Sequence, residues 1–175
     1  RVSVKSIKII NDHIYLGGIF THFKGNGASW TYARNGARLD INGKPDRSWN
    51  PEFNGTVIDI DVDENEAYYY AAGYFTRAHN RVVENAGRLS TAAGAELDQS
   101  WTFRHSYLIG KYQQTVTAAN GRVYFGGSQH SLFGYNSDSM TRTSGSITMN
   151  NGGDLQASTR SATGVVYDSC HCSDF

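Results

Sequence analysis

The sequence predicts an all-β chain assembled from repeated antiparallel sheets, and three observations support that fold class. A phrase at residues 14–21 (IYLGGIFT) returns at 69–76 (YYAAGYFT), and its first half returns at 123–127 (VYFGG). Several short segments alternate apolar and polar residues, which is typical of half-buried strands. No stretch of a dozen residues places apolar side chains at the helical spacing of about 3.6 residues, so no helix is expected.

The repeats have a nearly constant period. Phe20 and Phe75 lie 55 residues apart, and Trp49 and Trp101 lie 52 apart. Periods of roughly 40–50 residues are typical of propeller blades, each a small antiparallel sheet. We therefore predict a β-propeller-like repeat of about three and a half blades in a single domain spanning residues 1–175. The expected units are 4–55, 56–110, 111–157 and a partial unit at 158–175.

The elements follow from local patterns taken in order along the chain. Residues 5–9 and 57–62 alternate in polarity and are predicted strands, and the tyrosine-rich run at 68–70 favours a packed sheet. Asn-Gly pairs, as at 120–121, indicate tight turns. We expect the paired glycines to occupy crowded positions near the propeller axis. Trp49 and Trp101 are expected to wedge between neighbouring sheets.

A second, longer set of matching residues follows the first two copies of the phrase. Residues 35–40 (NGARLD) match 85–90 (NAGRLS), and residues 43–49 (GKPDRSW) match 94–101 (GAELDQSW). Together with the phrase, this series resembles the delta-60 type β-propeller repeat of bacterial surface proteins and some phage tail proteins. The resemblance covers residues 4–110 best and implies a propeller scaffold. It does not imply one activity, because function resides in sites placed on a fold.

Composition limits the classes of partner. Lys plus Arg and Asp plus Glu number 16 each, so the chain lacks the positive charge of a nucleic-acid or anionic-membrane binder. No segment approaches the ~20 apolar residues of a membrane span. A closed propeller needs about 4–8 blades, so we expect further blades of the same or another chain, the alternative being a complete, shorter open stack.

One cysteine cluster could hold a metal. Cys170, His171 and Cys172 offer thiolate and imidazole ligands suited to zinc or copper(I). The spacing is tight for a four-ligand site, and His130 is the nearest additional candidate in the repeat register. The alternatives are disulfide partners beyond residue 175 or two small buried or free cysteines, so no cofactor is favoured.

Two other polar sets favour structural roles. Asp59, Asp61 and Asp63 alternate along a strand but fail the pattern of a calcium loop, so we predict a solvated strand face. His22 and His79 lie 57 residues apart, which predicts nearly equivalent loop positions in two units.

Aromatic residues outside the repeated phrases are the best binding candidates. Trp30, Tyr32, Phe133 and Tyr135 fall in the longer, less repetitive connections. Loops carry function on rigid scaffolds, and aromatic faces suit sugar rings. The alternative for each residue is core packing against an adjacent unit.

The sequence lacks the common catalytic motifs of hydrolases and nucleotide-binding enzymes. We therefore predict a non-enzymatic scaffold or adhesion module that binds a glycan or a protein surface. Its expected location is extracellular, on a cell surface or on a virion. The rival hypotheses are a propeller-based glycan hydrolase or lyase whose catalytic residues lie partly outside this segment, and a docking module inside a larger assembly.

Overall fold

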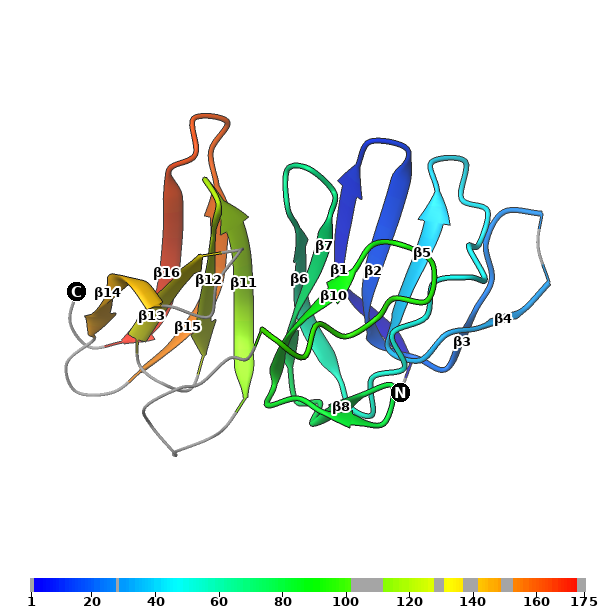
Figure 1. Cartoon of the computed structure of the whole chain (residues 1–175), viewed down its shortest axis with the longest axis horizontal. Coiled ribbons are helices and arrows are strands. Elements are labelled where there is room, and N and C mark those ends of the chain that lie inside the picture. The colour runs from blue at the N-terminus through cyan, green and yellow to red at the C-terminus, as the bar shows by residue number, and fades with distance from the viewer. Residues whose placement is uncertain are drawn as a thin grey trace.

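The computed structural model describes residues 2–27, 29–101, 112–127, 131–136, 142–148 and 153–172. These residues contain strands and turns and no helix. Figure 1 shows the sheets side by side, from the blue and cyan strands on the right, through the green strands in the middle, to the yellow, orange and red strands on the left. All main pairings are antiparallel, so the predicted fold class is confirmed.

Four sheets follow one another along the chain. The first sheet has the order β1 (Ser3–Ile10), β2 (His13–Ile19), β5 (Gly36–Asp40). The second consists of β6 (Val57–Val62), β7 (Tyr68–Gly73) and β10 (Ala86–Ser90). The third consists of β11 (Gln113–Ala119), β12 (Arg122–Gly127), β13 (Ser131–Asn136) and β14 (Arg142–Thr148). The fourth pairs β15 (Gly153–Arg160) with β16 (Val166–Cys172), so the unit boundary expected near residue 157 lies within β15.

Two short hairpins extend the first two units. They consist of β3 (His22–Phe23) with β4 (Thr31–Tyr32), and of β8 (Arg77–Ala78) with β9 (Arg81–Val82). His22 therefore opens β3, whereas its counterpart at the start of β8 is Arg77, and His79 lies in the β8–β9 turn with a φ of 47°. The prediction that the two histidines are equivalent is wrong, because His22 lies two residues after Phe20 whereas His79 lies four residues after Phe75.

A β-bulge recurs at one place in the first hairpin of all four sheets. The register shifts at the pairs Val4/Ser6, Val57/Asp59, Gln113/Thr115 and Leu155/Ala157. The bulge therefore gives a structural alignment of the sheets that is independent of sequence identity. It places Ile7, Ile60 and Val116 at one equivalent position.

The glycines opposite the bulge are required by close backbone approach. A Cβ atom on Gly73 would lie 2.1 Å from the carbonyl oxygen of Thr56, and one on Gly18 would lie 2.2 Å from that of Ser3. These contacts are to the paired strand of the same sheet, so the expected crowding at the axis is not the reason for these two glycines. Gly17 differs, because its Cβ would lie 2.7 Å from the Ile60 side chain of the next sheet.

Trp49 and Trp101 each pack between two sheets, as predicted. Trp49 is 1% exposed and meets Tyr15 of the first sheet and Tyr69 of the second at ring distances of 5.4 and 4.8 Å. Trp101 is 3% exposed and meets Tyr70 and Phe125 at 5.8 and 5.6 Å. Each of the two tryptophans therefore contacts a tyrosine at the same position of the preceding sheet, Tyr15 or Tyr70, and an aromatic ring of the following sheet, so they join successive sheets through two aromatic cores.

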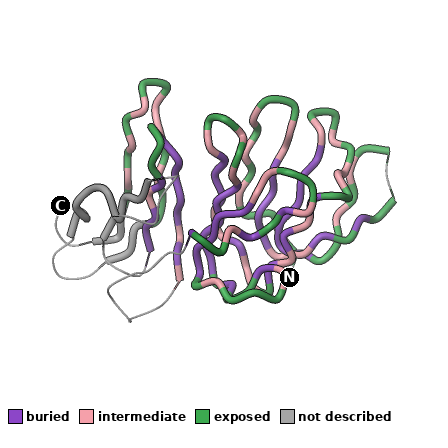
Figure 2. Tube along the Cα trace, in the orientation of Figure 1, coloured by how far each residue is buried: buried purple, intermediate pink, exposed green. Residues whose placement is uncertain are grey.

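An ion pair beside Trp49 is repeated beside Trp101. Arg38 binds Asp46 at 2.6 Å, and Arg88 binds Asp98 at 2.6 Å. Each guanidinium carbon also lies over the neighbouring tryptophan ring, at 5.7 Å for Arg38 and 5.8 Å for Arg88. Figure 2 shows buried segments running through the strands here, with exposure concentrated at the turns.

The carboxylates of β6 are not solvated, which corrects the predicted role of this strand face. Asp61 is 6% exposed, pairs with Lys8 at 2.9 Å and accepts a hydrogen bond from the Ala118 amide at 2.8 Å. Asp59 accepts from the Val116 amide at 2.9 Å and from the Ser6 hydroxyl at 2.7 Å. Burial raises the pKa of Asp59, although these bonds oppose the shift. Both side chains therefore link β6 to the innermost strands on either side.

A second polar cluster joins the turns of the first two sheets. Glu66 accepts hydrogen bonds from Asn11 Nδ2 at 2.8 Å and from the Tyr15 hydroxyl at 2.8 Å, and it pairs with His13 Nδ1 at 2.5 Å. Burial alone would raise the pKa of Glu66, but the bonds from these three residues outweigh it and hold the pKa below its usual value. The sequence did not reveal this pairing, because its partners lie more than fifty residues apart.

Candidate functional site

The hairpin of β3 and β4 presents two aromatic residues on one outward face. Residues alternate in exposure along this segment: Trp30 is 69% exposed and Tyr32 is 48% exposed, whereas Thr31 and Ala33 are buried. Pairing of β4 with β3 fixes the alternation, since Thr31 is in register with Phe23. The core-packing alternative is therefore wrong for Trp30 and Tyr32.

These aromatics line a surface hollow of about 440 Å³. We call it the outer groove and define it by its lining residues: Ser29, Trp30, Thr31, Tyr32, Arg47 and Asn50. A neighbouring hollow of about 580 Å³ shares Ser29 and Arg47 and adds Lys44 and Asp46. Sugar-sized ligands need such a concave, partly apolar surface with a few polar groups.

Hydrogen bonds fix the polar side of the outer groove. Arg47 donates from Nη2 to the Ser29 hydroxyl at 3.0 Å, which ties together two loops. Asn50 Oδ1 accepts from the backbone amides of Arg34 at 3.0 Å and Glu52 at 3.2 Å. Both side chains are thereby held beside the aromatic face before any ligand arrives.

The groove and its neighbour carry an excess of positive charge among their lining residues. Asp46 is the one acid in the two lining sets, and Arg38 already neutralises it through the ion pair of 2.6 Å. Burial would raise the pKa of Asp46, but hydrogen bonds from Ser48 and Arg38 lower it, so Asp46 stays ionised and paired. Lys44 and Arg47 remain to attract an anionic group.

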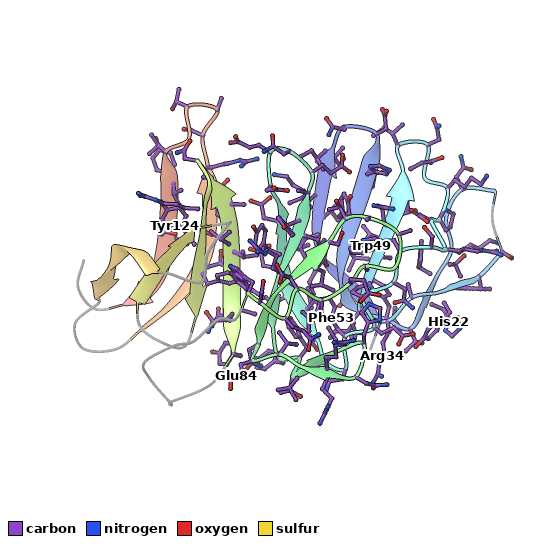
Figure 3. All side chains as sticks on the ribbon, viewed as in Figure 1. His22, Arg34, Trp49, Phe53, Glu84 and Tyr124 are labelled. Atoms are coloured by element: carbon purple, nitrogen blue, oxygen red, sulfur yellow. The ribbon has the colours of Figure 1, made fainter. Side chains whose placement is uncertain are left out.

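Figure 3 shows where this region lies on the molecule. The labelled His22 stands at the outer margin of the first unit, far across the chain from Tyr124 of the third sheet. The His22 ring meets the Tyr32 ring edge-on at 5.4 Å, which supports Tyr32 from the side of β3. The site therefore belongs to the periphery of the first unit.

The other predicted aromatics do not lie in loops. Phe133 and Tyr135 belong to β13, where their backbones are in register with Phe125 and Val123 of β12. Their side chains lie outside the described part of the structure. The expectation that they occupy an irregular connection is wrong, because residues 131–136 form a strand inside the third sheet.

The predicted metal cluster lies at the end of β16. Cys170, His171 and Cys172 pair in register with residues 155, 154 and 153 of β15. Their side chains and His130 lie outside the described residues, so the metal prediction stays a prediction. Among the side chains that the structure does describe, no group of three His, Cys, Asp or Glu residues could hold a metal ion.

Comparisons with solved structures identify the fold. The chain is similar to the WD40 β-propeller domain of Doa1, with a TM-score of 0.64 and 8% identity over 95% of this chain and 47% of that one. It is similar to the WD40 repeats of RRP9, with a TM-score of 0.60 and 6% identity over 96% of this chain and 51% of that one. The computationally designed Ika4 protein has a TM-score of 0.55 and 6% identity over 95% of this chain and 90% of that one.

These likenesses show that the chain has a β-propeller type of fold. The chain spans about half the length of the two WD40 chains, with 47% and 51% covered. Searches of family models and of curated proteins gave no match. The described residues also contain no helix of the length and apolarity that crossing a membrane requires.

Proposed function

We propose that this chain is a non-enzymatic propeller module that binds an acidic glycan in the outer groove. The observation that carries the proposal is the pair of exposed aromatic side chains, Trp30 and Tyr32, beside Arg47 in one hollow of about 440 Å³. The face of an exposed tryptophan provides a stacking platform for a sugar ring.

The basic side chains select the kind of glycan. Arg47 and Lys44 are the unbalanced charges here, and guanidinium groups bind carboxylates in a bidentate way. A uronic acid residue would therefore place its ring on Trp30 and its carboxylate near Arg47. The lining residues include one carboxyl group, that of Asp46, whereas glycoside hydrolysis ordinarily uses two. Binding without cleavage is thus the role that the groove favours.

The proposed setting follows from the sequence resemblance. A delta-60 type propeller that binds glycans would act outside the cytoplasm, on a bacterial surface, in a secreted protein or in a phage tail. Multivalent contact through loops on a propeller rim would raise avidity above the affinity of one groove.

Calorimetric titration with an oligogalacturonate, and with the neutral galactose oligomer of the same length, tests the proposal. We expect the acidic oligomer to bind more tightly, and Trp30→Ala to weaken its binding by roughly 10-fold. Arg47→Ala should reduce the preference for the acidic oligomer and the dependence of affinity on salt. Tyr74→Ala is the matched control, because Tyr74 is 54% exposed but lies outside the groove.

Two results would refute the proposed function. One is the absence of binding to either oligomer and to a broad glycan array. The other is equal weakening by Trp30→Ala and Tyr74→Ala, since that would separate affinity from the groove. Analysis of the recovered oligomer by mass spectrometry also checks the absence of cleavage.

A further inference from the structure

The two faces of each sheet have different neighbours along the propeller. In the second sheet, Val57 and Ile60 face the first sheet, because a Cβ on Gly17 would lie 2.7 Å from each of their side chains. In the third sheet, Val116 packs in one cluster with Ala72 of the second sheet. We call this side of a sheet, which meets the preceding sheet, its rear face.

The part of the rear face of the first sheet that β1 forms is exposed and apolar. Ile7 occupies the position of Ile60 and Val116 but is 59% exposed, whereas those two are 5% and 2% exposed. Ile9 is 60% exposed, and Val4 is 47% exposed. The position that is buried in the second and third sheets is therefore exposed in the first, although its residue is an aliphatic one in all three sheets.

We call the side of a sheet that meets the following sheet its forward face. In the fourth sheet, this forward face is exposed. Tyr15 and Tyr70 face the following sheet, and both are 0% exposed. Tyr167 occupies the same position relative to the bulge but is 59% exposed. Ser169, which aligns with Gly17, is exposed as well.

The chain therefore carries both halves of the interface that joins its own sheets, and the two halves do not meet. The exposure of Ile7 and of Tyr167 shows that the chain does not close on itself. One of the two polar contacts has a counterpart: the Thr159 hydroxyl aligns with Asp61, whose carboxylate accepts from the Ala118 amide, and Ile9 aligns with Ala118, whereas Ala157 stands at the position of Asp59.

We propose that two copies of this chain close a ring. The rear face of β1 in each copy binds the forward face of β16 in the other copy. Each junction would follow the packing between the second and third sheets, with Ser169 and Ile7 in the positions of Ala72 and Val116. Head-to-tail contacts form rings when the rotation closes. Two copies supply the length of the propeller chains that this chain half covers, at 47% and 51%.

Sedimentation equilibrium of the purified chain tests this proposal over a dilution series. We expect a species of twice 19.3 kDa. Ile7→Asp and Tyr167→Asp should each weaken the dimer by roughly 100-fold or more, because each buries an unpaired carboxylate at both junctions. Val82→Asp is the control, since Val82 is 70% exposed on β9 and should leave the mass unchanged.

Mixing the two variants gives the sharpest result. An Ile7→Asp chain retains an intact forward face and a Tyr167→Asp chain an intact rear face, so the mixture should form a mixed dimer through one intact junction. Far-UV circular dichroism checks that each variant stays folded, as expected for positions exposed in the single chain. A monomeric parent chain, an open-ended polymer, or a dimer that both variants preserve would overturn the proposal. These outcomes do not depend on glycan binding.

Discussion

Replacing Trp49 with alanine tests how much the packing between the first two sheets contributes to the free energy of unfolding. Trp49→Ala removes a side chain that is 1% exposed, two edge-on aromatic contacts and a hydrogen bond from Nε1 to the Ser90 carbonyl at 3.0 Å. Large-to-small changes of buried aromatics cost about 3–5 kcal/mol. The unpaired carbonyl adds about 1 kcal/mol. The free energy of unfolding should therefore fall by about 4–6 kcal/mol, a large share of the stability of a small domain.

Urea denaturation followed by circular dichroism measures this change, and the chain contains its own control. Trp30 is 69% exposed, so Trp30→Ala should change the free energy of unfolding by no more than about 0.5 kcal/mol. If the two tryptophan variants unfold within about 1 kcal/mol of each other, Trp49 is not the bridge between the first and second sheets, and the interpretation of the repeat fails.

Three further predictions concern the contacts within and between sheets. Gly73→Ala should cost about 1–3 kcal/mol in urea unfolding, because its Cβ would lie 2.1 Å from the Thr56 carbonyl oxygen. A loss no larger than that of Gly87→Ala, whose Cβ would lie 3.1 Å from the Val83 side chain and would have side-chain atoms as its nearest neighbours, would contradict this. Asp61→Ala should cost about 1–3 kcal/mol by leaving a buried amide unpaired; unchanged stability would show that this link between β6 and β11 is dispensable. Although burial opposes it, hydrogen bonding lowers the pKa of Glu66, so its stabilisation is fully present above the unfolded value of 4.5 and is lost as pH falls through the lower folded value. Glu66→Gln should therefore flatten the acid side of the pH–stability curve, and an identical slope in both proteins would remove this role for Glu66.

Sequence reasoning predicted the parts of the fold that depend on local pattern. The alternation at residues 57–62 coincides with β6, and the Asn120-Gly121 pair forms the turn between β11 and β12 with φ values of 53° and 70°. It failed for the partners of the alternating carboxylates. Period-two patterning shows that Asp59 and Asp61 share a face, but not that the next sheet covers it, because that contact is made by residues 57 positions away.

The candidate site was predicted in part, for a similar reason. Trp30 and Tyr32 are conspicuous as aromatics outside the repeated phrase. Arg47 and Asn50 were missed, since nothing local marks them as neighbours of β4, and the loop-to-loop bond from Arg47 to Ser29 exists only in the folded chain.

The separation of the sheets has an evolutionary consequence. In the described part of the chain, every strand ladder stays within one sheet, and neighbouring sheets are joined by side chains such as those of Trp49 and Asp59. A gene duplication that inserts a whole unit therefore breaks no ladder, provided that the new copy keeps the tryptophan and the bulge. A propeller gene could therefore gain or lose whole units while the sequence of each unit diverges. The repeated residues of this chain, which are clear in the first two units and few in the later ones, are what such a history would leave.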